Sequence, residues 1–229
     1  MEYIWDYLDK TAYNNRSGHY KSKRQLDFIL QHSAHCRENI LDIAGGAGRF
    51  SIPLSAFSKN ITVLDINEKA IQLLKERNKE FFTLCGDFTE LDIPGVYSLI
   101  ICIEALPYFS DWIAFFRKTA SLLASNGRFI FTYTNPDSWR YFLRKLRRGP
   151  KPDRYTHMRF PDLQRVLGQC NLQIDTINGM NWIPLPVTSN SPLVRLFCLI
   201  EKKLKLNNWH KQSPWLLISV KRNDIPSLD

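Results

Sequence analysis

Short apolar runs alternate with amphipathic stretches along the first two thirds of the chain. Continuous apolar runs are typical of strands buried on both faces of a sheet, and apolar residues spaced three or four apart are typical of helices. The runs predict strands at 39–43, 61–65, 81–85, 96–103 and 128–134, with helices between them. This alternation predicts an α/β fold in which helices cover both faces of a mostly parallel sheet.

The remainder of the chain continues the pattern less regularly. We expect a helix at 160–169 and strands at 172–177 and 215–221, whereas residues 138–156 and 183–213 interrupt the alternation as insertions. Residues 1–35 are expected to form a helical cap, with its helix beginning at Lys21. A chain of 229 residues suits one domain, so we assign residues 1–229 to a single unit.

Residues 39–50 contain the strongest chemical signal. The first strand ends in a glycine-rich turn, Ala44-Gly45-Gly46-Ala47-Gly48, and helical spacing resumes over 47–58. Glycine permits positive φ and a close approach of a ligand to the backbone. Asp65 follows Gly46 by nineteen positions and ends the second strand. An acid in that place can accept hydrogen bonds from ribose hydroxyls, so the arrangement predicts a nucleotide site.

The details of the turn indicate which nucleotide it binds. The dinucleotide pattern G-x-G-x-x-G fails, because Ser51 stands where the third glycine belongs. The stretch Leu41–Gly48 instead resembles the first motif of class I S-adenosylmethionine-dependent methyltransferases, L-D-x-G-x-G-x-G. Ala44 departs from this motif, because the family usually has glycine there. A positive φ at Ala44 would be strained.

The resemblance implies a Rossmann-like seven-stranded sheet of order 3-2-1-4-5-7-6 with strand seven antiparallel. It implies S-adenosylmethionine as cofactor, with Asp87 accepting from the adenine amine and Phe88 lying against the ring; the alternative is that Asp87 is a simple turn acid. The expected cofactor-binding residues are Asp42, Ala44, Gly45, Gly46, Gly48, Asp65, Ile66, Gly86, Asp87, Phe88, Ile103 and Glu104.

The same resemblance implies a small-molecule acceptor. Members of the family that methylate base amines have an Asn/Asp-Pro-Pro-Tyr motif, whereas this chain has Leu106-Pro107-Tyr108. His157-Met-Arg-Phe160 looks like the His-x-x-Phe stretch of many small-molecule methyltransferases. His157 is therefore our first candidate for a general base, with Glu104 second, and the alternative is that His157 packs on the following helix.

Further residues are candidates for the acceptor side. Tyr108 and Tyr133 are expected to line the acceptor pocket, and the two insertions are expected to lie near it. In the family the leading segment often closes over cofactor and substrate, which makes Arg16, Tyr20 and Arg24 possible contacts there. The alternative is that the aromatic residues of this segment simply cap the core.

The positive charge of the chain indicates which kinds of acceptor it could bind. The chain has 31 Lys and Arg against 22 Asp and Glu, a net charge of +9. Cations crowd the stretch 140–154, which also contains apolar residues, and 192–206 is a second basic amphipathic stretch. Both suit an amphiphilic or phosphate-bearing acceptor, such as a lipid, quinone, glycan or natural-product intermediate, or peripheral contact with a membrane. Alternatively, they are ordinary solvated surface segments.

Other classes are disfavoured. The sequence has no apolar run of eighteen residues and no signal-peptide pattern, so a cytoplasmic protein is expected. Five scattered cysteines without a C-x-x-C pair predict no metal site. We retain an RNA methyltransferase and a non-catalytic binding protein of the same fold as alternatives, although nucleic acid is not the expected partner. An NAD-dependent oxidoreductase is disfavoured by Ser51.

Overall fold

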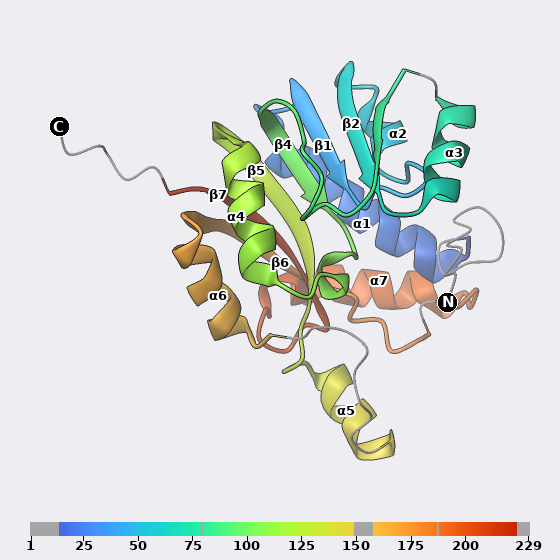
Figure 1. The fold of residues 1–229 in the computed structure, drawn as a ribbon. Coiled ribbons are helices and arrows are strands. Elements are labelled where there is room, and N and C mark those ends of the chain that lie inside the picture. The colour runs from blue at the N-terminus through green and yellow to red at the C-terminus, as the bar shows by residue number, and fades with distance from the viewer. Residues whose placement is uncertain (1–13, 79, 149–157, 187, 224–229) are drawn as a thin grey trace.

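One seven-stranded sheet organises the molecule (Figure 1). The computed structural model describes residues 14–78, 80–148, 158–186 and 188–223. The strand order is β3-β2-β1-β4-β5-β7-β6, which confirms the predicted topology. The strands are β1 (Asn39–Ile43), β2 (Asn60–Asp65), β3 (Phe82–Cys85), β4 (Tyr97–Cys102), β5 (Leu123–Thr134), β6 (Leu172–Met180) and β7 (Trp215–Arg222).

The direction of β7 determines which segments share an edge with the glycine turn. β1 to β5 pair in parallel, whereas β7 is antiparallel to both β5 and β6. Thr134, the last residue of β5, is paired with Trp215, the first residue of β7. The carboxyl ends of the parallel strands and the start of β7 therefore lie along one edge, where ligands of open α/β sheets bind.

Helices cover both faces of this sheet. They are α1 (Arg16–His32), α2 (Ser51–Leu54), α3 (Glu68–Arg77), α4 (Trp112–Leu122), α5 (Trp139–Arg148), α6 (Phe160–Gln169) and α7 (Leu193–Lys203), with 3₁₀ turns at Leu106–Tyr108 and Leu206–Asn208. Side chains of α4 and α6 pack in one buried cluster and those of α1, α2 and α3 in another. α7 lies near the carboxyl edge, and α5 projects away from the body (Figure 1).

Two helices differ from their predicted bounds. α1 begins at Arg16 rather than Lys21, because the Asn15 side chain accepts a hydrogen bond from the Gly18 N–H at 2.9 Å and caps the helix there. α2 is limited to Ser51–Leu54 instead of 47–58. Gly48 has a φ of 88°, which no residue of a right-handed helix can have, so the preceding residues remain in the turn.

Candidate active site

The glycine turn after β1 has the backbone that its sequence demands. Gly46 and Gly48 have φ angles of 58° and 88°, and Ala44 has a φ of 56°. A Cβ atom on Gly45 would lie 2.6 Å from Cγ1 of Val63, closer than packed atoms tolerate. The turn therefore needs glycine where a side chain would clash, and at Ala44 it imposes a strained left-handed conformation.

Asp65 connects this turn to the end of β2. Its Oδ2 accepts a hydrogen bond from the Gly46 N–H and its Oδ1 from the Asn67 N–H, both at 2.8 Å. Burial raises the pKa of Asp65, and these backbone hydrogen bonds oppose the rise. A carboxylate has about four lone pairs, so each oxygen can still accept from a ribose hydroxyl. The acid thus lies where the sequence predicts a nucleotide contact.

The side chain of Asp42 lies against the glycine turn at Gly45. Asp42 is 2% exposed and accepts a hydrogen bond from the Ser51 hydroxyl. Burial raises the pKa of Asp42 to about 7, against the opposing effect of the Ser51 hydrogen bond. Ser51 thus has a structural use that a glycine could not supply. A small pocket opens beside Asp42 and is lined by Asp42, Ala44, Gly45, Arg49, Phe50 and Ile103.

The expected adenine contacts after β2 and β3 differ in accessibility. Ile66 is 70% exposed beside Asp65. Asp87 accepts hydrogen bonds from the Thr89 N–H and hydroxyl through Oδ1, which is also how a turn acid behaves. Gly86 has a φ of 150° and donates to the Asp65 carbonyl. Phe88 is 1% exposed, and its ring packs against Phe109 and Phe115, so this ring is not accessible to an adenine.

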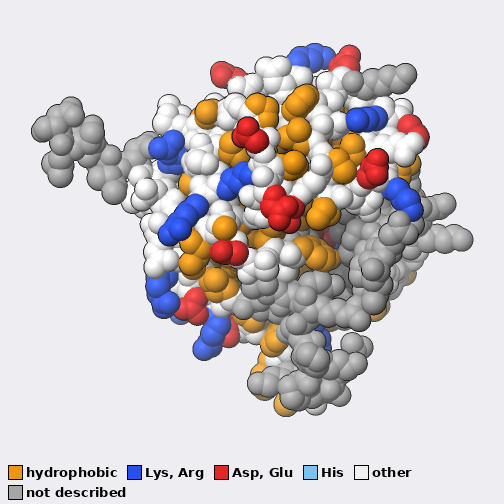
Figure 2. Space-filling view, viewed as in Figure 1, with side chains coloured by type: hydrophobic (Ala, Val, Ile, Leu, Met, Phe, Trp, Pro, Cys, Tyr) orange, Lys and Arg blue, Asp and Glu red, His pale blue; other side chains and the backbone are white. Residues whose placement is uncertain are grey.

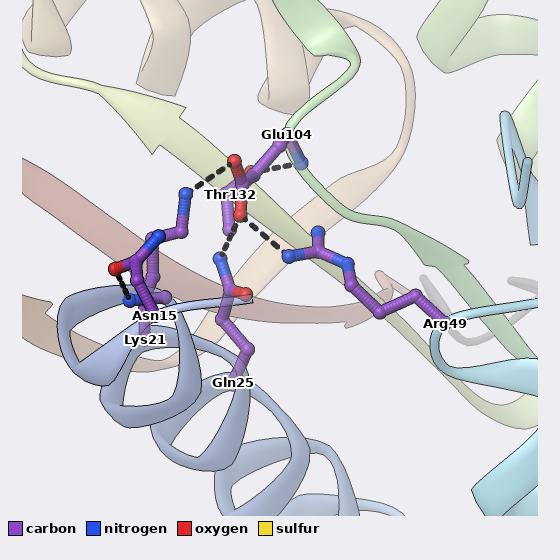
Figure 3. Close-up of polar contacts among 7 residues, drawn as sticks. Asn15, Lys21, Gln25, Arg49, Glu104 and Thr132 are labelled. Carbon is purple, nitrogen blue, oxygen red and sulfur yellow. Dashed lines mark hydrogen bonds and ion pairs between the residues drawn. The ribbon is translucent and has the colours of Figure 1, made fainter. Parts of the chain in front are cut away.

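Glu104, directly after β4, is the centre of a buried polar cluster (Figure 3). Its Oε2 accepts from Nζ of Lys21 at 3.0 Å, and its Oε1 accepts from Nε2 of Gln25 at 2.9 Å and Nη1 of Arg49 at 3.0 Å. The Glu104 N–H donates to the Thr132 hydroxyl, and its φ is 64°. Both oxygens of this carboxylate are therefore already engaged by neighbouring side chains.

This cluster fixes α1 over the carboxyl edge. Lys21 is 4% exposed, and burial lowers its pKa, while Glu104 opposes that change. Nζ of Lys21 also lies 4.9 Å from the centre of the Trp215 ring at the start of β7. Sequence reasoning missed Lys21, Gln25, Arg49 and Thr132; only Arg49, next to the glycine turn, had a sequence signal that pointed to the site.

The predicted acceptor contacts of the leading segment lie on α1, near α7. Arg24 Nη2 is 3.9 Å from Oε1 of Glu201, whose side chain is buried. Burial raises the pKa of Tyr20, and the nearby Glu201 carboxylate adds to the rise. Arg16 is exposed, and its N–H donates to Oδ1 of Asn190. Of these three candidates, Tyr20 and Arg24 therefore contribute to the packing of α1 on α7.

The two tyrosines expected in the acceptor pocket have different surroundings. Tyr108 is 54% exposed after β4. Tyr133 is 1% exposed, and its hydroxyl donates to the Met158 carbonyl at 2.5 Å. Burial raises the pKa of Tyr133. His157 lies outside the described residues, but the Tyr133 hydroxyl fixes the residue that follows it. Among the described residues, no cluster of His, Cys, Asp and Glu could hold a metal ion.

Comparison with known proteins places this geometry in a family. The family model for the methyltransferase domain matches residues 11–177. The chain therefore belongs to that family, and it is a class I S-adenosylmethionine-dependent methyltransferase, as the sequence predicted. This membership removes the NAD-dependent oxidoreductase from the alternatives.

Individual relatives differ in the atom that their names say they methylate. A ubiquinone biosynthesis O-methyltransferase of Nitrosospira multiformis is 25% identical over 177 residues, covering 70% of this chain and 73% of that protein. The N-methyltransferase NodS of Bradyrhizobium japonicum, solved with S-adenosylhomocysteine, has a TM-score of 0.63 at 17% identity and 96% and 92% coverage. Magnesium protoporphyrin IX methyltransferase of Synechocystis, also solved with S-adenosylhomocysteine, has a TM-score of 0.65 at 15% identity and 90% and 85% coverage.

Proposed function

We propose that the chain methylates an oxygen atom of a small or amphiphilic acceptor, such as a lipid, quinone, glycan or natural-product intermediate. The observation that carries the proposal is the contact between the Asp65 carboxylate and the Gly46 N–H, which joins the glycine turn to an acid placed to accept from a ribose. Oxygen is favoured over nitrogen by the similarity to O-methyltransferases of ubiquinone biosynthesis over 70% of this chain.

The residues present fit the cofactor. The turn has no side chains at Gly45, Gly46 and Gly48 to block a ligand. Asp65 can accept from the ribose, and Asp87 has a second carboxylate oxygen for the adenine amine. The pocket between Asp42, Arg49 and Ile103 offers a carboxyl group and a guanidinium group for the amino-acid end of the cofactor. When bound, S-adenosylmethionine supplies a methyl group on a positively charged sulfur, which becomes an uncharged thioether on transfer.

The chain then has to position the acceptor and remove a proton from it. Positioning supplies most of the rate enhancement in a displacement whose leaving group needs no protonation. A hydroxyl acceptor loses a proton as its oxygen gains the methyl group, and His157 is the proposed proton acceptor because histidine titrates near neutral pH. Glu104 is assigned a positioning role, since Lys21 and Arg49 already hold its carboxylate.

Calorimetric titration tests the cofactor half of this proposal. We expect S-adenosylhomocysteine and S-adenosylmethionine to bind with micromolar affinity and NAD not to bind. Asp65→Ala should abolish binding, whereas Asp27→Ala, on the solvent side of α1 with 50% of its side chain exposed, should not change it. A folded wild-type protein that binds neither form of the cofactor would refute the assignment.

A turnover assay tests the acceptor half. Transfer of labelled methyl groups should occur to phenols and catechols that carry an alkyl chain, and not to the matching anilines or to RNA. Methylation of the anilines alone would favour the chemistry that the name of NodS describes. Methylation of RNA would favour the RNA methyltransferase, and cofactor binding without turnover on any acceptor class would favour the non-catalytic alternative.

A further inference from the structure

α7 exposes its apolar face and buries its acid. Val194 and Glu201 are buried at 2% and 3% exposure. Leucines and an isoleucine lie on the outer side instead, at Leu193 (49%), Leu196 (50%), Leu199 (59%), Ile200 (37%) and the C-cap residue Leu204 (61%). A surface helix ordinarily turns its apolar stripe to the core, so the exposed stripe indicates that something else covers this helix.

α5 also exposes large apolar side chains. Phe142, Leu143 and Leu146 are 62%, 41% and 68% exposed. The helix projects from the body, and hydrophobic side chains reach the surface over it (Figures 1 and 2). Three large apolar residues on one short, projecting helix are more than scattered surface exposure would give.

The charges between these apolar residues have one sign. α5 contains no Asp or Glu, and the only acid of α7 is the buried Glu201. The exposed cations of the two helices include Arg144, Arg195, Lys202 and Lys203, and Lys205 follows just after α7. Away from these helices, on the upper part of the face seen in Figure 2, acidic and basic side chains are interspersed. The two helices therefore present a cationic and apolar surface to one kind of partner, an anionic and apolar one.

Hydrogen bonds hold the base of α5 close to the segments that flank α7. Nδ2 of Asn135, just before α5, donates to the carbonyls of Lys211 and Ser213 at 3.0 Å, after α7. Arg140 donates to the carbonyl of Ile183, before α7. Since Thr134 pairs with Trp215, both helices leave the sheet at the edge that holds the glycine turn.

We propose that α5 and α7 together form a docking surface for an anionic lipid bilayer, defined by Phe142, Leu143, Leu146, Leu193, Leu196, Leu199, Ile200 and Leu204 and the cations between them. Apolar side chains beside Lys and Arg are what binds a helix at the headgroup boundary of such a membrane. A second copy of the chain is a poorer occupant, because two cationic surfaces repel each other. The inference goes beyond the proposed function, since it says where the enzyme works rather than which atom it methylates.

Sedimentation with vesicles tests this surface. Wild-type protein should sediment with vesicles of phosphatidylglycerol and phosphatidylcholine, should remain in solution with phosphatidylcholine alone, and should be released by added salt. The double variant Leu196→Ser and Leu199→Ser should bind at least about tenfold more weakly, because each leucine loses apolar burial in the membrane.

A matched control uses the opposite edge of the sheet. Phe82→Ser with Val96→Ser removes two apolar side chains that are 54% and 55% exposed there, and should leave vesicle binding unchanged. Both variants should bind S-adenosylhomocysteine like the wild type, which separates failure of this inference from failure of the proposed function. The inference is overturned if wild-type protein ignores anionic vesicles or if the Leu196/Leu199 variant binds them equally well. It is also overturned if that variant instead abolishes a dimer seen by light scattering.

Discussion

Nζ of Lys21 and Oε2 of Glu104 lie 3.0 Å apart although 83 residues separate them in the chain. The side chains are 5% and 12% exposed, so the pair is shielded from water. Arg49 binds the other oxygen of the same carboxylate. One anion thus joins the capping helix, the glycine turn and the end of β4.

Replacement of Glu104 should therefore lower the free energy of unfolding substantially. Glu104→Gln removes the negative charge that Lys21 and Arg49 share in this mostly buried cluster, and we expect the free energy of unfolding to fall by about 3 kcal/mol. Urea unfolding measures this change. Lys23→Gln is the control, because the Lys23–Asp27 pair on the same helix is largely exposed and should contribute less than about 1 kcal/mol. Equal effects of the two variants would show that the cluster contributes no more than a surface ion pair.

Asp42 should make stability depend on pH. Its pKa is raised from 3.8 to about 7 in the folded chain, so the folded state binds a proton that the unfolded state releases. The contribution of this proton to the free energy of unfolding is fully present below about pH 4 and is lost as the pH rises through about 7. Asp42→Asn should flatten this fall in urea unfolding measured from pH 4 to 8.

The comparison with wild type is needed because the raised pKa of Asp65 acts in the same direction. A residual slope in Asp42→Asn is therefore expected. If the slope of the variant equals that of the wild type, Asp42 does not carry a raised pKa.

Ala44 should tolerate glycine and reject a branched side chain. Its φ of 56° costs alanine about 1 kcal/mol, and Ala44→Gly would remove this strain from the folded state. Glycine also gives the unfolded chain more conformational freedom, which lowers the free energy of unfolding by a similar amount. We expect that variant to stay within about 1 kcal/mol of wild type and to bind S-adenosylhomocysteine at least as tightly. Ala44→Val should lose about 2 kcal/mol, because a β-branched residue fits this conformation poorly. Tenfold weaker cofactor binding by Ala44→Gly would show that the methyl group itself is needed.

Tyr133 should affect turnover without affecting cofactor binding. Tyr133→Phe removes the hydrogen bond to the Met158 carbonyl, and Met158 follows the proposed base, His157. We expect kcat to fall about tenfold, because a reacting group that is misplaced reacts more slowly. The affinity for S-adenosylhomocysteine should stay unchanged. Tyr141→Phe on α5 serves as the control. If Tyr133→Phe turned over as fast as the wild type, this hydrogen bond would not contribute to catalysis.

Local spacing in the sequence predicted the glycine turn with Asp65 and the helix at 160–169, whereas the strand order was predicted only through the resemblance to the methyltransferase family. It could not predict the Glu104 cluster, since Lys21 and Gln25 reach Glu104 only when α1 is packed across the sheet edge. The start of α1 depended on the Asn15 cap, and the short α2 depended on backbone angles in the turn. Phe88 was assigned to the adenine by position in the motif, whereas packing placed its ring in the core.

The outward-facing stripe of α7 also has an evolutionary consequence. The family model matches residues 11–177, so the glycine turn and Asp65 lie within the matched stretch and α7 lies outside it. Mutations that remodel α7 need not disturb the turn after β1. If α7 docks as proposed, substitutions there would change where the enzyme binds while the glycine turn and Asp65 stay the same.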